Sequence, residues 1–206
     1  RGARDALALL VLTWIFAIAA GRKVAVYCSV VSGAFDRGSF QRMVAKLKRK
    51  GLQPDIVAVL ASWLRQRYAH EVVGGSVSDR MTLSNMVYQG TVTGAILWNL
   101  FFEDARLPIN ECFFEEVVYA DDLNSYREFP SDTPNDIILV SLKSCQHELH
   151  TWGAANQVAF DAGKESQHVL SLSDPFGCNF KMLGVPFDTM LSMADAVSEI
   201  VSAASW

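Results

Sequence analysis

The chain has 206 residues, of which 50% are hydrophobic and 19% are charged, and its net charge is −4. This composition excludes an intrinsically disordered chain and supplies enough apolar surface for a sizeable core, so we predict one folded domain. The charge is unevenly distributed, since residues 1–80 carry +8 and residues 81–206 carry −12. A basic first part favours contact with nucleic acid phosphates, whereas an acidic second part favours a bound cation.

The first predicted element is a helix over Ala6–Gly21, a stretch of 16 residues that contains no charge. A helix of this length spans about 24 Å, less than the membrane hydrocarbon core of about 30 Å, so the pattern indicates a buried helix. Asp5 directly precedes the stretch, which argues against the basic start of a signal peptide. A membrane-associated fragment that uses this helix is an alternative.

Apolar spacing and turn residues predict the remaining elements in chain order. They are a strand over 22–32, helices over 39–51 and 54–67, a hairpin around Gly74 and Gly75, a helix over 95–105, a hairpin with strands over 113–119 and 123–129, a helix over 136–156, and strands over 168–172 and 180–185. This order is typical of an α+β protein in which helices back an antiparallel sheet.

The stretch "VVYADDLNSY" places Ala120, Asp121 and Asp122 at the turn of the second hairpin. Two adjacent aspartates are a poor structural choice there, because such turns favour residues that tolerate positive φ and because like charges repel. Carboxylates at the end of a buried strand suit Mg²⁺, which leaves coordination positions for substrate phosphates. The pair therefore indicates a polymerase-type metal site, with a solvated hairpin tip as the structural alternative.

The four cysteines show no paired spacing, so neither a zinc ribbon nor a disulfide partner is predicted. An intracellular location, nuclear or cytoplasmic, is expected because reducing compartments suit unpaired cysteines. Cys145, His147 and His150 could hold a metal from one helix face, but their spacing is more typical of an ordinary amphipathic helix.

Five stretches then occur in the order of the polymerase palm motifs A to E: "SGAFDR", "QGTVTG", "YADD", "WGAANQVAFDAGKE" and "FKMLGVPFD". Together they make the chain resemble the reverse transcriptase of non-LTR (LINE-like) retrotransposons over nearly all of its length. The resemblance implies a right-hand polymerase palm with partial fingers over residues 1–206, cut from a longer protein, with the thumb and the N-terminal fingers absent. It also implies an RNA-directed DNA polymerase, a nucleotidyltransferase that uses an RNA template, a DNA primer and dNTP.

The resemblance assigns roles to individual residues. Asp121 and Asp122 match the metal-binding acids of motif C, where two Mg²⁺ (or Mn²⁺) ions activate the primer hydroxyl and stabilise the leaving pyrophosphate. Lys164 matches the motif D lysine, a candidate acid for the leaving group.

Other matched positions concern the nucleotide and the template. Phe35 matches the aromatic residue that excludes a ribose 2′-hydroxyl. Gln89 and Gly90 match the motif B loop, where a backbone without Cβ can approach the nucleotide and template. The turn at 183–184 matches motif E beneath the primer.

Motif A departs from the family pattern at one position. Its metal aspartate stands four residues before the Ala of Ala-Phe-Asp, and counting back from Ala34 leads to Val30. Asp36 follows six residues after Val30 and is expected to cap or pair at the next helix instead. Breaking a buried ion pair costs about 3 to 5 kcal/mol, which corresponds to a loss of about 10² to 10⁴ in rate. We therefore predict a weakened metal site and a catalytically impaired polymerase.

A non-catalytic alternative is a remnant that binds RNA or an RNA–DNA hybrid. Its basic residues would be the run 46–50 together with Arg65 and Arg67. Phosphate contacts of this kind weaken steeply as salt rises.

Overall fold

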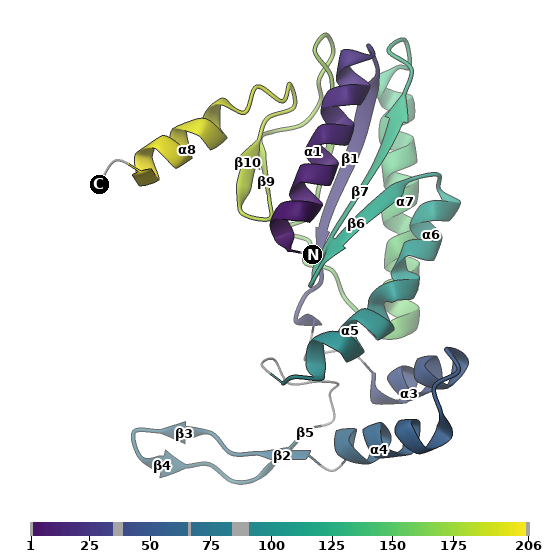
Figure 1. The fold of residues 1–206 in the computed structure, drawn as a ribbon, viewed down its shortest axis with the longest axis vertical. Coiled ribbons are helices and arrows are strands. Elements are labelled where there is room, and N and C mark those ends of the chain that lie inside the picture. The colour runs from purple at the N-terminus through teal and green to yellow at the C-terminus, as the bar shows by residue number, and fades with distance from the viewer. Residues whose placement is uncertain (1, 35–38, 66, 84–90, 205–206) are drawn as a thin grey trace. The chain divides into compact units, whose positions relative to one another are not determined.

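The computed structural model describes residues 2–34, 39–65, 67–83 and 91–204, which fall into two units (Figure 1). The first unit comprises Arg1–Val31, Ala105–Trp152 and Phe160–Trp206, and the second comprises Ser32–Asp104 and Gly153–Ala159. The prediction of one reverse transcriptase domain over 1–206, with partial fingers and palm, stays a prediction.

An antiparallel sheet in the order β6-β7-β1-β8 forms the centre of the first unit. Its strands are β1 (Lys23–Val30), β6 (Glu115–Tyr119), β7 (Asp122–Phe129) and β8 (Ser166–Leu170). Side chains of β1 are buried on both faces of the sheet, as its largely apolar sequence predicts. The two faces are covered by different elements (Figure 1): α1 (Ala3–Ala19) lies on one and α7 (Asn135–Asn156) on the other.

The α1 face holds an aromatic core. The ring of Trp14 is completely buried, with its centroid 6.4 Å from that of Tyr126 on β7 and 5.9 Å from that of Phe187, both in edge-on geometry. Phe187 belongs to a second hairpin, β9 (Phe180–Met182) and β10 (Val185–Phe187), which joins the same core. This packing buries one side of the predicted first helix.

The other side of α1 exposes apolar residues, including Leu12 and Phe16. Gly21, at φ 72°, terminates the helix as predicted. Within the described ranges, every helix is too short or too polar to cross a membrane.

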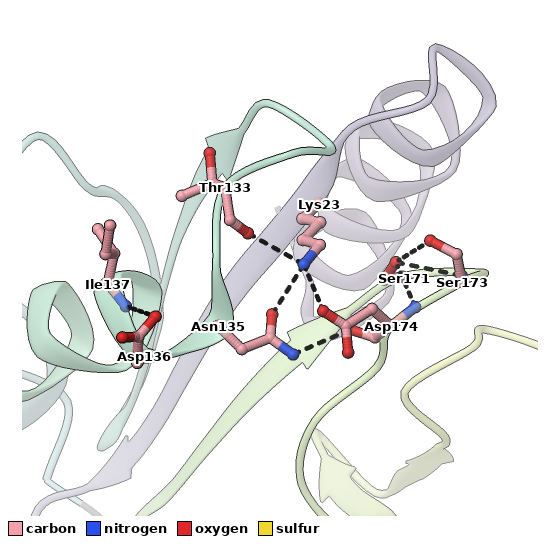
Figure 2. Close-up of polar contacts among 8 residues, drawn as sticks. All are labelled: Lys23, Thr133, Asn135, Asp136, Ile137, Ser171, Ser173 and Asp174. Atoms are coloured by element: carbon pink, nitrogen blue, oxygen red, sulfur yellow. Dashed lines mark hydrogen bonds and ion pairs between the residues drawn. The ribbon is translucent and has the colours of Figure 1, made fainter.

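A buried lysine ties the start of β1 to two distant loops (Figure 2). The Lys23 ammonium donates to the Thr133 carbonyl at 3.0 Å, to Asn135 Oδ1 at 3.0 Å and to Asp174 Oδ2 at 2.6 Å. Asn135 Nδ2 in turn donates to the Asp174 carbonyl at 3.1 Å. Three ammonium donors meet three oxygen acceptors, so the charge is buried without an unsatisfied donor.

The second unit is built from short helices and two small hairpin sheets. Its elements are α3 (Phe40–Arg49), α4 (Pro54–Leu64), β2 (Arg67–Ala69), β3 (Val72–Val73), β4 (Ser76–Val77), β5 (Met81–Leu83) and α5 (Gly94–Phe102). Ser39 Oγ accepts from the Arg42 amide and caps α3, and Pro54 occupies the first turn of α4. The predicted hairpin at Gly74 and Gly75 is confirmed, since both residues have positive φ between β3 and β4.

The element boundaries differ from the prediction at several places. The helix predicted over 54–67 ends at Leu64, and Arg67 begins β2. The strand predicted over 180–185 is the β9–β10 hairpin, because Leu183 and Gly184 adopt φ 48° and 84° and form its turn. Two further helices were not predicted, α6 (Arg106–Glu111) and α8 (Ala194–Ala204). The α+β class itself, an antiparallel sheet backed by helices, is confirmed.

Candidate functional site

The β6–β7 hairpin places the two aspartates differently from the prediction. Tyr119 pairs with Asp122, so the turn consists of Ala120 and Asp121, and Asp122 is the first residue of β7. Ala120 takes the positive φ, at 55°. One carboxylate therefore stands on the turn and the other at the start of a central strand.

Val30 lies directly across from Asp122 in the register between β1 and β7. The amide of Val31 donates to the Asp121 carbonyl at 2.9 Å, which ties the end of β1 to the hairpin tip. Residues opposed in this way have Cα atoms about 4.5 to 5.5 Å apart. An isopropyl group thus stands next to Asp122, at the position where the motif count predicts the missing carboxylate.

The segment that carries Lys164 reaches the same end of β1. The Asp161 amide donates to the Val30 carbonyl at 2.9 Å, and the Lys164 amide donates to the Asp161 carbonyl at 2.8 Å. Lys164 Nζ lies 3.9 Å from Asp161 Oδ2, and the Lys164 side chain is 64% exposed. The structure therefore brings together Val30, Asp121, Asp122 and Lys164, which come from three separate parts of the chain.

Electrostatics at this site favour a bound cation. Partial burial raises the pKa of Asp122, the neighbouring Asp121 carboxylate raises it further, and the Lys164 charge opposes both effects. A carboxylate whose ionised form is disfavoured in this way gains from any additional positive charge nearby.

The residues present suit one Mg²⁺ better than two. Magnesium commonly uses one or two carboxylates and completes its octahedral shell with water and phosphate oxygens. Asp121 and Asp122 can supply that number. Across the described residues, however, no group of three or more His, Cys, Asp or Glu side chains is arranged to hold a metal ion. Val30 supplies no oxygen, so the three-carboxylate arrangement implied by the family is incomplete here.

The structure does not describe the other predicted positions of the site. Phe35, Gln89 and Gly90 lie outside the described residues, as does Asp36. In the alternative metal cluster, Cys145 is buried with its sulfur 3.8 Å from Ser125 Oγ.

A buried carboxylate next to Lys164 was missed by the sequence analysis. The Glu165 side chain is only 6% exposed and accepts hydrogen bonds from the Tyr27 hydroxyl, from His150 Nε2 at 2.7 Å and from Gln146 Nε2 at 3.3 Å. Gln146 and His150 are four residues apart on α7 and so share one helix face. This four-residue spacing can be read from the sequence, but it does not indicate that Glu165 is the shared partner.

Many of the basic groups proposed for nucleic acid contact are ion-paired within the second unit. Lys46 and Arg49 pair with Asp104 at 2.6 and 2.8 Å, and Lys50 pairs with Glu103. Two further basic side chains, Lys48 and Arg65, line a groove of about 750 Å³ between α3 and α4. Two of the proposed basic side chains therefore share this groove, and three others are ion-paired.

The chain is similar in sequence to part of a known polyprotein and similar in fold to solved structures. No family model matches the chain. It is 23% identical over 114 residues to the retrovirus-related Pol polyprotein from type-1 retrotransposable element R2 of Popillia japonica. That match covers 50% of this chain and 19% of the polyprotein.

The fold is similar to two solved telomerases. Apo telomerase from Candida tropicalis, truncated from its C-terminal domain, matches with a TM-score of 0.67 at 9% identity, over 92% of this chain and 39% of that one. Telomerase from Candida albicans, in complex with a TWJ fragment of telomeric RNA, matches with a TM-score of 0.59 at 14% identity, over 93% and 33%. The fold is therefore telomerase-like, and the sequence is similar to part of a retrotransposon Pol polyprotein, in agreement with the resemblance of the motifs.

Proposed function

We propose that this chain is the palm region of a non-LTR retrotransposon reverse transcriptase, whose RNA-directed DNA synthesis is impaired by Val30. One observation carries the proposal: Val30 pairs directly with Asp122, at the end of the strand that should supply the first metal ligand. The sequence match to the R2 polyprotein supports the retrotransposon origin.

In this proposal Asp121 and Asp122 hold a Mg²⁺ or Mn²⁺ ion. Such an ion, when bound, neutralises charge on the phosphates of an incoming dNTP. Val30 removes the third carboxylate, so the remaining pair retains one ion weakly and a second ion poorly.

Lys164 supplies the other polar group of the proposed site. Its ammonium acts on Asp122 electrostatically, and its side chain extends into solvent. A protonated amine in this place can neutralise phosphate oxygens and donate a proton to leaving pyrophosphate. The proposed partners are accordingly an RNA template, a DNA primer and dNTP. A telomerase of similar fold was solved with a fragment of telomeric RNA, which supports an RNA partner.

Primer extension tests the proposal. The chain and its Val30→Asp variant, each joined to the flanking segments of the R2 polyprotein, are compared on poly(rA) with an oligo(dT) primer and Mg²⁺ or Mn²⁺. We expect Val30→Asp to extend primers about 10² to 10⁴ times faster, because it restores a buried charge partner. Val140→Asp, which adds the same charge at an exposed position of α7, is the control. Equal extension by the unchanged chain and Val30→Asp would refute the proposed site.

A second candidate function is RNA binding without catalysis. It is favoured by the groove between α3 and α4, where Lys48 and Arg65 line the same cavity. Two phosphate contacts predict a shallow salt dependence, with a slope of log K on log salt of about −1.4 for single strands. Lys48→Ala should reduce this slope by about 0.7. A slope that does not change removes the groove from the proposal.

A further inference from the structure

We propose that Glu165 is a positioning residue that holds Lys164 beside Asp122, through a buried network that links β1 to α7. This inference rests on the proposed function, since it gives the Lys164 ammonium a task at the metal site. Glu165 is the last residue of the motif D stretch, but the resemblance assigned it no role.

The backbone around Lys164 is tied to the end of β1. Residues 161–165 form a tight turn around Asp161, whose carbonyl accepts from the Lys164 amide at 2.8 Å and from the Glu165 amide at 3.1 Å. Asp161 Oδ1 accepts from the Gly163 amide at 3.1 Å. The turn is joined to β1 through the Asp161 amide and the Val30 carbonyl. The Lys164 amide is thus hydrogen-bonded directly to Asp161, the residue that is attached to the strand end.

Lys164 and Glu165 are neighbours in the chain, but their side chains differ in exposure. The Lys164 side chain is 64% exposed, whereas the Glu165 side chain is 6% exposed. An exposed lysine stem has several rotatable bonds, and its local contact, Asp161 at 3.9 Å, is a loose one. The backbone beneath it must therefore be held from the buried side if the ammonium is to stay near Asp122.

Three hydrogen-bond donors surround the Glu165 carboxylate. Tyr27 reaches it from the centre of β1, and Gln146 and His150 reach it from α7. Gln146 Oε1 also accepts from Gln167 Nε2 at 2.9 Å, which extends the network to β8. A buried carboxylate with three donors on two elements has one favourable position, because moving it would leave a buried charge without partners.

His150 contacts residues at both ends of the turn. Its ring stacks on Phe160, with centroids 5.3 Å apart and an interplanar angle of 17°. Phe160 forms a β-bridge with Val31. The same histidine therefore holds both ends of the turn, Phe160 by stacking and Glu165 by a hydrogen bond.

Hydrogen exchange on the chain without the Val30→Asp change tests whether Glu165 holds the turn at 161–165. It requires no activity measurement. In Glu165→Gln, the amides of residues 161–165 should exchange at least about tenfold faster, while the β1–β7 ladder keeps its protection. Glu128→Gln, which removes an exposed ion pair with Arg22 elsewhere on the sheet, is the matched control and should leave residues 161–165 unchanged. Unaltered exchange at 161–165 in Glu165→Gln would overturn the proposal.

A pair of His150 variants covers the case in which Glu165→Gln unfolds the whole unit. His150→Phe keeps the ring on Phe160 and removes the hydrogen bond, whereas His150→Gln keeps a donor and removes the ring. We expect faster exchange at 161–165 in His150→Phe and a smaller increase in His150→Gln, which loses only the stacking contact. Unchanged exchange at 161–165 in His150→Phe would show that the hydrogen bond to Glu165 does not hold the turn.

The role toward Lys164 is tested by kinetics in the Val30→Asp background. Glu165→Gln should lower kcat by about ten to a hundredfold with little change in KM for dNTP, because misplaced groups lose rate more than binding. Lys164→Ala should lower kcat similarly, and the double variant should be no slower than Lys164→Ala alone. Additive losses would refute the positioning role. If Val30→Asp itself extends no primer, the proposed function fails, and the exchange measurements still decide whether Glu165 holds the turn.

Discussion

Charged side chains have opposite environments at the two ends of β1. At the first end, Lys23 is 3% exposed and its ammonium meets three oxygen acceptors (Figure 2). At the second end, Val30 faces Asp122, whose pKa is raised by burial and by Asp121. A satisfied buried charge holds elements together, whereas a partly buried pair of like charges costs free energy until a cation arrives. The contrast separates a structural charge from a functional one within a single strand.

The largest expected effect is at the satisfied end. Lys23→Met keeps a similar volume but leaves Asp174, Asn135 and the Thr133 carbonyl without their shared donor. We expect the free energy of unfolding to fall by about 3 kcal/mol, near the lower end of the range for a broken buried pair because Asp174 is partly exposed. Urea denaturation provides the measurement. Arg22→Met, which breaks the exposed pair with Glu128 next door, should cost less than about 1 kcal/mol. Equal losses of unfolding free energy in the two variants would show that Lys23 contributes no more to stability than an exposed ion pair does.

The second-largest change in stability is expected at the Val30 end of β1. Val30→Asp places a third carboxylate opposite Asp122, so without metal it should lower stability by about 1 to 3 kcal/mol. Mg²⁺ should restore this loss, since a ligand at about a hundred times its Kd adds about 2.7 kcal/mol. Thermal unfolding with and without Mg²⁺ measures both changes. If the unaltered chain responds to Mg²⁺ as strongly as Val30→Asp does, Val30 is not the missing ligand position.

The third effect concerns the hairpin tip. Ala120 is exposed and has φ 55°, a conformation that costs L-residues about 1 kcal/mol or more. Ala120→Gly should therefore stabilise the fold, by up to about 1 kcal/mol after the greater entropy of the unfolded glycine is subtracted. Ala162→Gly is the control at an exposed turn position, and it should be neutral or slightly destabilising. A loss of stability in Ala120→Gly would contradict the strain argument.

The smallest effect tests the sign of the electrostatics. Because the pKa of Asp122 is raised in the folded state, the fold binds its proton more tightly than the unfolded chain does. The stability linked to this proton is present in acid and is lost as pH rises through the folded pKa. Asp122→Asn should thus be more stable than the parent at pH 7, by less than about 1 kcal/mol, because the group is partly solvated.

Below about pH 4 the difference should vanish, since the parent is then protonated as well. Asp132→Asn, at an exposed loop, serves as the control for the loss of a carboxylate. A parent that is more stable than Asp122→Asn at pH 7 would show that Asp122 has a favourable partner and does not await a cation.

Several elements could be read from local chemistry. The apolar run of β1, the spacing of α7 and the glycines at 74–75 each predict structure from a few neighbouring residues. The missed elements lack such signals: α6 contains Pro108 in its first turn, where proline is tolerated but reads as a helix breaker. The turn at 183–184 is indicated by its match to motif E, whereas local propensity disfavours Leu183 at positive φ and so predicts an unbroken strand there.

The sequence by itself determined the chemistry of the proposed site. The order of the motifs identifies Asp121, Asp122 and Lys164, and a count of four residues from Ala34 identifies Val30. These assignments depend on the resemblance of the ordered motifs to the family and, for Val30, on a count within motif A, both of which can be read from the order of residues along the chain.

Tertiary structure alone decided which groups meet. The partners of Lys23 lie 110 to 151 residues away, and Tyr27 lies 138 residues from Glu165. Such pairs form because sheet register and helix packing bring distant segments to one place, and short-range spacing carries no information about that distance. For the same reason, the pairing of Val30 with Asp122 becomes a physical statement only once β1 and β7 lie side by side.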